Sequence, residues 1–250
     1  MALSKNNYKL IRSLQTKKGR AKHGLFVVEG KKSVKEFIRS NQFQIRMLFS
    51  SDMDGAHNLD KSCEVITKLE LKSISSFSNP DDYLGIFEIG LPKNLREDGL
   101  ILALDQVNDP GNLGTIIRLC DWFDIKQIWC EKGTVDQFNP KVVQATMGSL
   151  NRVEVVYLDL EQTINQTSLN VYLSDMGGES IYDTEFSETG ILVMGNEANG
   201  VSDKLRTRGR NIVSIPQYSS EGSKTESLNV AMATGLILGE IRRQHNLFKT

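Results

Sequence analysis

Short apolar runs alternate with segments of helical spacing along residues 100–244, and this alternation limits the fold more than any other feature. The apolar runs have the length of strands, and the segments between them repeat apolar residues every three or four positions. Such a series predicts a mostly parallel sheet with helices on both faces. We expect strands at 100–104, 126–130, 152–156, 170–174, 191–194 and 211–215, and helices at 111–123, 139–147 and 228–244.

A smaller α/β alternation precedes this series and predicts a separate front domain. Apolar residues among basic ones at 3–18 favour an amphipathic helix, and Gly30 opens a second one. A polar stretch with Pro92 and Gly99 is typical of a linker. We therefore expect a front domain at 1–90, a linker at 91–99 and a second domain at 100–250. The front strands are expected at 24–29, 45–49, 63–66 and 83–89.

The net charge of −1 conceals a strong asymmetry. Residues 1–40 hold eleven Lys and Arg against Glu29 and Glu36, a balance of +9. A basic front end on an acidic body indicates a polyanionic partner. The alternative is an ordinary solvated helix face, because exposed lysines are common.

Several classes of protein find no support in the sequence. No apolar run approaches the length of a membrane span, so we expect no membrane partner. The three cysteines lack metal-site spacing and share no pattern with the histidines. Their odd number suits a reducing compartment. We expect Cys120 and Cys130 in the core. We expect no metal. Neither a GxGxxG after the first strand nor a GxxxxGK[ST] is present, which removes two common nucleotide-binding folds.

The stretch ILVMGNEANG at 191–200 is a candidate ligand-binding segment. Its apolar half predicts a buried strand, and its second half predicts a tight loop at the carboxyl end of that strand. Ligands of open α/β sheets bind at these ends. Gly195 allows either a close approach of the backbone to a ligand or a positive φ. The alternative is an ordinary surface turn between a strand and a helix, which has the same sequence pattern.

Two further stretches contain candidate functional residues. In LDQVNDPGNLGTIIRL, at 104–119, a turn leads into a helix for which Asn112 is a candidate N-cap. Arg118 follows among apolar residues, as either a surface side chain or a partly buried anion clamp. The second stretch joins Ile215-Pro216 to SLNVAMATG at 227–235, where Ser227 and Asn229 suit either a polar site or a helix start.

Together, the three stretches resemble the ordered motifs of the SpoU (TrmH-like) branch of the SPOUT methyltransferases, over about residues 100–245. The basic segment before them resembles the substrate-binding domain that many of these enzymes carry, itself similar to ribosomal proteins that bind bent RNA. The resemblance implies catalytic roles for Asn112, Arg118, Glu197, Ser227 and Asn229, and cofactor contacts by Gly195, Asn196, Ile215 and Leu228.

The resemblance also implies a fold and an activity. The second domain would be a trefoil-knot α/β domain that binds S-adenosylmethionine and methylates a ribose 2′-hydroxyl. The resemblance favours ribosomal RNA over transfer RNA as the substrate. It also implies that the enzyme is a homodimer in the cytoplasm. Small residues at 231, 235 and 239 on the last helix fit either a dimer interface or packing within the chain. Arg118 would hold the phosphate beside the target ribose.

The sequence leaves several alternatives open. The loop at 217–226 is longer than in the relatives, which puts its path over RNA in doubt. A non-catalytic RNA-binding or ribosome-assembly protein with the same fold is the competing hypothesis, and a transfer RNA enzyme is a second. Glu197 has a structural alternative as an acceptor for backbone N–H groups of its own turn.

Overall fold

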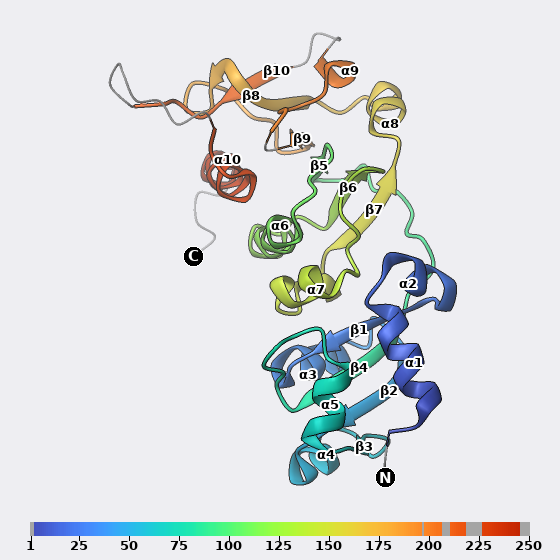
Figure 1. Cartoon of the computed structure of the whole chain (residues 1–250). Coiled ribbons are helices and arrows are strands. Elements are labelled where there is room, and N and C mark those ends of the chain that lie inside the picture. The colour runs from blue at the N-terminus through green and yellow to red at the C-terminus, as the bar shows by residue number, and fades with distance from the viewer. Residues whose placement is uncertain (1–2, 197, 207–210, 219–226, 246–250) are drawn as a thin grey trace. The chain divides into compact units, whose positions relative to one another are not determined.

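The computed structural model describes residues 3–196, 198–206, 211–218 and 227–245, apart from the side chain of His57 (Figure 1). The chain divides into two compact units. The front unit holds Met1–Pro92 with Asp136–Asn151, and the second unit holds Lys93–Val135 with Arg152–Thr250. Within the described residues, no helix has the length and apolar composition needed to cross a bilayer.

A mixed four-stranded sheet forms the centre of the front unit, in the order β1-β4-β2-β3. β4 pairs antiparallel with β1 and β2, and β2 pairs parallel with β3. The strands are β1 (Leu25–Glu29), β2 (Ile45–Ser50), β3 (Glu64–Val65) and β4 (Tyr83–Glu88). The helices are α1 (Lys5–Leu14), α2 (Lys17–His23), α3 (Lys31–Ser40), α4 (Met53–Leu59), α5 (Lys68–Ile74) and α7 (Pro140–Thr146). All four expected strands are confirmed.

The basic helix expected over 3–18 is interrupted. α1 buries Ile11 and Leu14 and then ends, because the Thr16 side chain accepts a hydrogen bond from the Gly19 backbone at 3.0 Å and starts α2. Thr16 has the extended backbone of an N-cap residue. The amphipathic pattern continues through this break, so periodicity alone does not reveal it.

Residues 136–151 pack with the front unit, although the sequence pattern places them in the second domain. The Phe138 ring lies 4.5 Å from the Phe26 ring within a group of aromatic side chains. The buried Arg20 guanidinium donates from Nε to Asp136 Oδ2 at 2.8 Å and from a terminal nitrogen to the Leu14 carbonyl at 2.9 Å. A guanidinium this buried requires such partners.

A six-stranded parallel sheet forms the centre of the second unit, in the order β10-β8-β9-β5-β6-β7. The strands are β5 (Leu100–Leu104), β6 (Gln127–Glu131), β7 (Glu154–Leu158), β8 (Val171–Ser180), β9 (Gly190–Met194) and β10 (Asn211–Ser214). The helices are α6 (Pro110–Trp122), α8 (Leu160–Gln166), α9 (Asp203–Arg206) and α10 (Val230–His245). The predicted parallel sheet is confirmed, whereas the short helices α8 and α9 were absent from the prediction.

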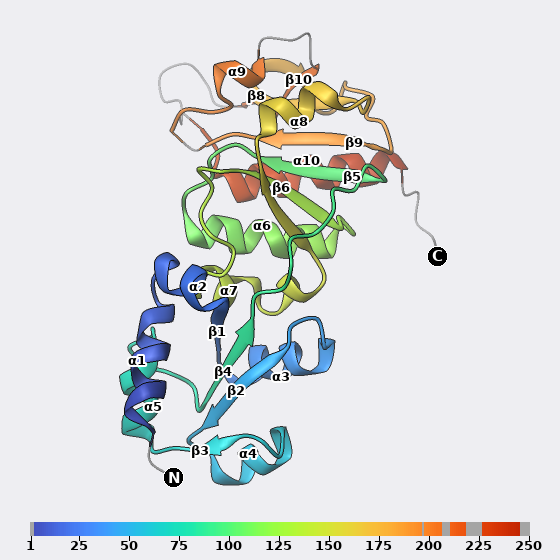
Figure 2. The same cartoon turned by 90° about the vertical axis from the view of Figure 1, so that its right-hand side faces the viewer.

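Helices cover both faces of this sheet (Figures 1 and 2). One face presents Ala103, Trp129 and Val193 to side chains of α8 and α9. Alternate strand residues point the other way, where α6 and α10 lie side by side. Because both faces are buried, β5 and β9 consist entirely of buried residues. This explains the unbroken apolar runs in the sequence.

The trefoil knot stays a prediction. A knot depends on how the C-terminal part of the chain passes the loop after β9, and residues 207–210 and 219–226 of that path lie outside the described residues.

Candidate functional site

The carboxyl ends of β5 and β9 lie at one edge of the parallel sheet, with Leu104 opposite Met194. The Asp105 backbone N–H donates to the Met194 carbonyl at 2.9 Å. Two residues past the end of each strand, Asn196 Nδ2 donates to the Gln106 carbonyl at 2.7 Å. The loops that follow β5 and β9 are therefore tied together at the edge where ligands of such sheets bind.

The loop after β9 folds back on itself. Asn196 and Gly200 exchange two backbone hydrogen bonds, at 3.0 and 2.8 Å, and Asn196 Oδ1 accepts from the Ala198 backbone at 2.9 Å. A Cβ atom on Gly195 would lie 2.1 Å from the Gly200 carbonyl carbon and 2.3 Å from the Val201 nitrogen. Gly195 is thus required by the loop's own backbone. The positive φ in this loop belongs to Gly200, at 64°.

Asp105 anchors the end of the same loop, a role that the sequence analysis missed. Its side chain is 1% exposed, and Oδ2 accepts a hydrogen bond from the Ser202 backbone at 2.7 Å. Among the described residues, Asp105 Oδ1 and Ser202 Oγ have no hydrogen-bond partner. The sequence did contain a signal for this role, because Asp105 directly follows a fully apolar strand. A buried carboxylate is costly unless it accepts hydrogen bonds.

Asn112 lies in the first turn of α6, but it is not the N-cap. Asp109 takes that position, because its Oδ1 accepts from the Asn112 backbone at 2.8 Å and Pro110 begins the helix. The prediction that Asn112 caps the helix is wrong. A proline at the first helical position lacks only an N–H that would be unpaired there, which favours a start at Pro110.

The side chain of Asn112 meets Asn229, the residue before α10. Asn229 Nδ2 donates to Asn112 Oδ1 at 2.9 Å. Asn229 Oδ1 accepts from the backbones of Ala231 and Met232, at 3.0 and 3.2 Å. The helix-start interpretation of Asn229 is therefore confirmed, whereas its role in a polar site stays a prediction.

Arg118 is exposed on α6, as the surface interpretation predicts. At 3.6 residues per turn, six residues place it about 120° around the helix from Asn112. No carboxylate pairs with its guanidinium in the described part of the chain. The structure therefore brings Asn112 and Asn229 together, and it leaves Arg118 free to contact an anion in solution.

The remaining candidates flank the segment 219–226, which lies outside the described residues. Ile215 follows β10 and is half-buried, Ser227 is exposed, and Leu228 is 50% exposed directly before Asn229. Most of the long loop at 217–226, and Glu197 itself, also lie outside the described residues. The predicted role of Glu197 stays a prediction.

The two thiols near this part of the fold are inert. Cys120 on α6 and Cys130 on β6 are buried, as expected from the sequence. Burial raises the pKa of both thiols, so neither forms a thiolate at neutral pH. Neither cysteine is a candidate nucleophile.

Comparison with known proteins covers both units. The SpoU rRNA Methylase family matches residues 99–239, and the MRM3-like substrate binding domain matches residues 5–85. In Bacillus subtilis (strain 168), the 23S rRNA (guanosine(2553)-2′-O)-methyltransferase RlmP is 27% identical over 237 residues, which span 92% of this chain and 94% of that protein.

Two solved structures match over nearly the whole chain. An AdoMet-bound rRNA methyltransferase from Sinorhizobium meliloti is 30% identical, with a TM-score of 0.83 and 99% of both chains covered. A TrmH-family protein from Porphyromonas gingivalis is 35% identical, with a TM-score of 0.86, over 97% of this chain and 99% of that chain.

Proposed function

This chain belongs to the SpoU rRNA Methylase family, and we propose that it transfers the methyl group of S-adenosylmethionine to a ribose 2′-hydroxyl of ribosomal RNA. The resemblance that the three sequence motifs indicated is confirmed by the family match. The site residues of this proposal are those at the edge of the parallel sheet, beside the loop after β9.

One observation supports this site best. The hydrogen bond between Asn229 and Asn112 joins the start of the last helix of the motif region, α10, to its first helix, α6. The loops after β5 and β9 are tied together at the same sheet by the bond from Asn196 to the Gln106 carbonyl. Each of the two later motifs thus makes a side-chain hydrogen bond to a residue of the first motif.

The chemistry of the available groups fits S-adenosylmethionine. The adenine base of the adenosyl group is a flat, neutral ring with polar edges, which suits apolar walls and backbone hydrogen bonds. Ile215 and Leu228 offer partly exposed apolar side chains, and Gly195 has no side chain to keep a ligand from its backbone. In this proposal Gly195, Asn196, Ile215 and Leu228 hold the cofactor, which supplies an activated methyl group on its sulfonium.

The protein's own part in the reaction is positioning. A guanidinium remains protonated at any physiological pH, so Arg118 serves as a phosphate clamp for the target nucleotide. The amides of Asn112 and Asn229 and the hydroxyl of Ser227 would orient the 2′-hydroxyl in line with the methyl group. Alignment of this kind supplies several kcal/mol of the barrier, about 7 or more in favourable cases. Glu197 is proposed as a further polar residue of this site.

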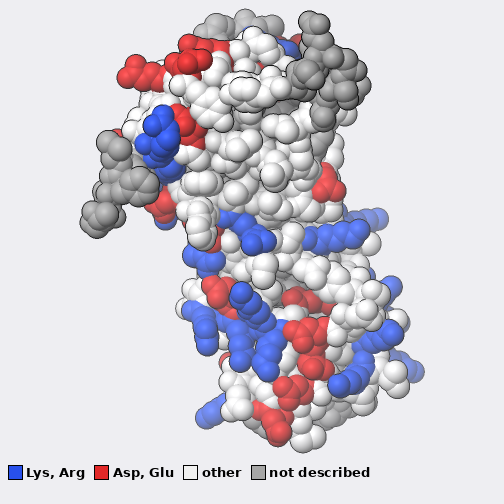
Figure 3. Space-filling model, turned by 90° about the vertical axis from the view of Figure 1, so that its left-hand side faces the viewer, with Lys and Arg blue, Asp and Glu red and all other residues white. Residues whose placement is uncertain are grey.

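The proposed RNA partner contacts the front unit. On the face shown in Figure 3, most of the visible Lys and Arg side chains lie over this unit. Ribosomal RNA is favoured over transfer RNA because the RlmP relative, which matches over almost the whole chain, is described as a 23S rRNA enzyme. A protein that acts on this RNA works where ribosomes are, and free cysteines suit a reducing compartment, so we place it in the cytoplasm.

We also propose a homodimer, although not through the stripe of small residues on α10. A Cβ atom at Gly235 would lie 3.5 Å from the Leu119 side chain, and one at Gly239 would lie 3.9 Å from Phe123. These glycines therefore face α6 of the same chain. The exposed apolar side chains of the two helices, Trp122, Met232 and Leu236, are the better candidates for an interface.

The test has two stages. Calorimetric titration with S-adenosylmethionine and with its demethylated product should give micromolar binding, which a non-catalytic relative would lack. Transfer of a labelled methyl group should then be measured on ribosomal RNA and on transfer RNA. Arg118→Ala should lower the transfer rate by about a hundredfold or more while cofactor affinity survives.

Arg96→Ala is the matched control, since the Arg96 side chain is 42% exposed and its ion pair is with Asp98 on the same loop. Loss of transfer in both variants would remove Arg118 from the site. Absence of cofactor binding in folded protein would instead favour the RNA-binding hypothesis.

A further inference from the structure

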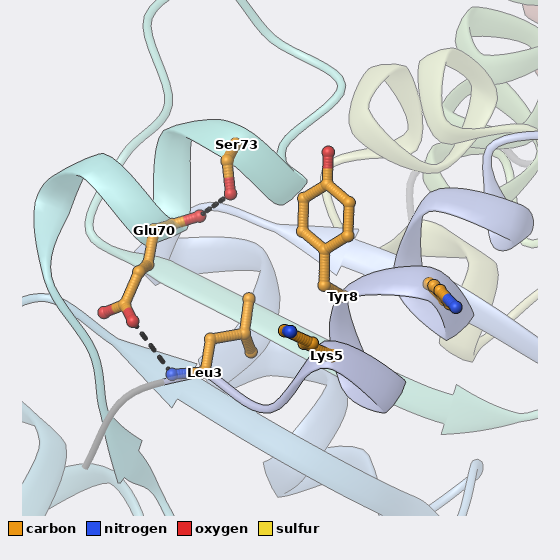
Figure 4. A pocket seen from close by; sticks show the side chains of 6 residues that line it. Leu3, Lys5, Tyr8, Glu70 and Ser73 are labelled. Atoms are coloured by element: carbon orange, nitrogen blue, oxygen red, sulfur yellow. Dashed lines mark hydrogen bonds between the residues drawn. The ribbon is translucent and has the colours of Figure 1, made fainter.

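A cavity of about 300 Å³ lies between α1 and α5 of the front unit (Figure 4). It is separate from the residues assigned above to methyl transfer, all of which belong to the second unit. Its volume is at the lower end of the range for small-ligand sites, and it opens to solvent. Six residues line it: Leu3, Lys5, Tyr8, Lys9, Glu70 and Ser73.

The cavity has an aromatic wall. Tyr8 is 41% exposed, although Ile11, one turn further along the same helix, is buried. Figure 4 shows the Tyr8 ring standing between α1 and α5, with the Lys5 side chain seen nearly end-on beside it. A partly exposed aromatic ring is a platform for stacking.

The charges beside this ring are unbalanced. Lys5, Lys9 and Arg12 recur at helical spacing along α1, which contains no acidic residue. In the described part of the protein, none of the three has a carboxylate within ion-pair distance. Like charges at this spacing repel one another on a helix. Other cations of the same unit do have carboxylate partners, since Lys31 pairs with Asp52 and Lys68 with Asp82.

The single carboxylate of the cavity is already engaged. Glu70 accepts hydrogen bonds from the backbones of Leu3 and Thr67, at 2.9 and 2.8 Å, and these bonds lower the pKa of its carboxyl group. The Ser73 hydroxyl donates to the Glu70 carbonyl. The negative charge is therefore fixed on the α5 side, and the free positive charge lies on the α1 side. A ligand with an anionic part must place that part along α1.

We propose that this cavity binds one unpaired nucleobase of the RNA substrate, stacked on Tyr8, with the adjoining phosphates held by Lys5 and Lys9. An aromatic face between lysines matches the two parts of a nucleotide, since every base has a π-face and every linkage has a negative charge. This inference rests on the proposed function, because it concerns the RNA that the enzyme methylates. It adds a site at which an unstacked base is held away from the reacting ribose.

The test compares three variants of the full-length protein. Binding of a fluorescently labelled single-stranded RNA and of a fully paired RNA duplex is measured by anisotropy at fixed salt. Tyr8→Ala should weaken single-strand binding by about tenfold, while Tyr8→Phe, which keeps the ring, should bind like the unaltered protein. Duplex binding should be the same for all. Tyr182→Ala removes a similarly exposed tyrosine from the second unit and should change neither.

The two lysines are tested by salt dependence. Replacing Lys5 and Lys9 by Gln should reduce the slope of log affinity against log salt by about 1.4 for the single strand. The inference is overturned if Tyr8→Ala binds the single strand as tightly as the unaltered protein, or if it loses duplex binding to the same extent.

Methyl transfer separates this inference from the proposed function. Tyr8→Ala should raise the KM for RNA and leave S-adenosylmethionine affinity unchanged. If the unaltered protein binds single-stranded RNA through Tyr8 but neither binds the cofactor nor transfers methyl, the proposed function fails and the cavity assignment stands.

Discussion

Asn229 donates a hydrogen bond from Nδ2 to Asn112 Oδ1 at 2.9 Å, across 117 positions of sequence. The same Asn229 accepts two backbone hydrogen bonds through Oδ1 at the start of α10. One side chain thereby fixes where the last helix begins and holds the amide of a residue on α6. The start of α10 and the candidate site are therefore coupled through a single residue.

The two roles of Asn229 can be separated by substitution. Asn229→Ala should lose both, with a loss of stability of about 1 kcal/mol and a large loss of methyl transfer. Asn229→Asp keeps an acceptor for the helix start but loses the donor to Asn112, so stability should be retained and transfer lost. Denaturant unfolding and labelled-methyl transfer measure the two effects.

A matched control for the cap is Asp159→Ala, which removes the side chain that caps α8 at 3.0 Å. Asp159→Ala should lower the free energy of unfolding about as much as Asn229→Ala does, but it should leave the rate of methyl transfer by the folded protein unchanged. Full activity in Asn229→Asp would show that the bond to Asn112 has no part in the reaction.

The sequence predicted most of the sheet and the motif positions but not the local contacts. Apolar runs such as 100–104 and 191–194 reveal buried strands because both faces of a parallel sheet are covered. The sequence analysis explained Gly195 by close approach of a ligand or by a positive φ. In the structure a glycine is needed at 195 because the backbones of Gly200 and Val201 leave no room for a Cβ atom. The helix break at Thr16 and the anchor at Asp105 depend on one hydrogen bond each, and no periodic pattern reports a single bond.

Gly195→Ala should disrupt the loop after β9. The added methyl group would meet backbone atoms of Gly200 and Val201 at 2.1–2.4 Å, which cannot yield as a flexible side chain could. The expected result is a loss of S-adenosylmethionine affinity of tenfold or more, about 1.4 kcal/mol, measured by calorimetry. Gly90→Ala is the control, since a Cβ atom there meets nothing within 4 Å and its φ is not positive. Equal affinity in both variants would refute the assignment of this loop to the cofactor.

Acid should weaken the ion pair between Glu240 and Arg243 within α10. This side chain is 6% exposed and accepts two hydrogen bonds from Arg243 at 2.8 Å. Its pKa is lowered chiefly by Arg243, so its contribution to stability is present above the ordinary glutamate pKa and is lost as pH falls through the lowered value. Glu240→Gln should therefore lose less stability over that acid range than the unaltered protein.

Thermal unfolding as a function of pH checks this expectation. The exposed Glu97→Gln serves as the control and should follow the unaltered protein throughout. If Glu240→Gln shows the same acid dependence as the unaltered protein, the pairing with Arg243 does not contribute to stability.

The proposed dimer predicts that charge on the exposed face of α10 separates the protomers. Met232 is 65% exposed and Leu236 is 46% exposed, and they lie one turn apart on α10. Met232→Glu combined with Leu236→Glu would bury two carboxylates at an interface, which is unfavourable without partners. The variant should have the mass of a single chain by light scattering after gel filtration, whereas the unaltered protein should have twice that mass.

Met53→Glu is a close control for this test, because Met53 on α4 is also 65% exposed and lies in the front unit. It should remain dimeric. Since both substituted positions of the double variant are exposed in the single chain, the fold should persist, and circular dichroism should show an unchanged helix content. A double variant that stays dimeric would place the interface elsewhere, whereas an unaltered protein with the mass of one chain would refute the dimer itself.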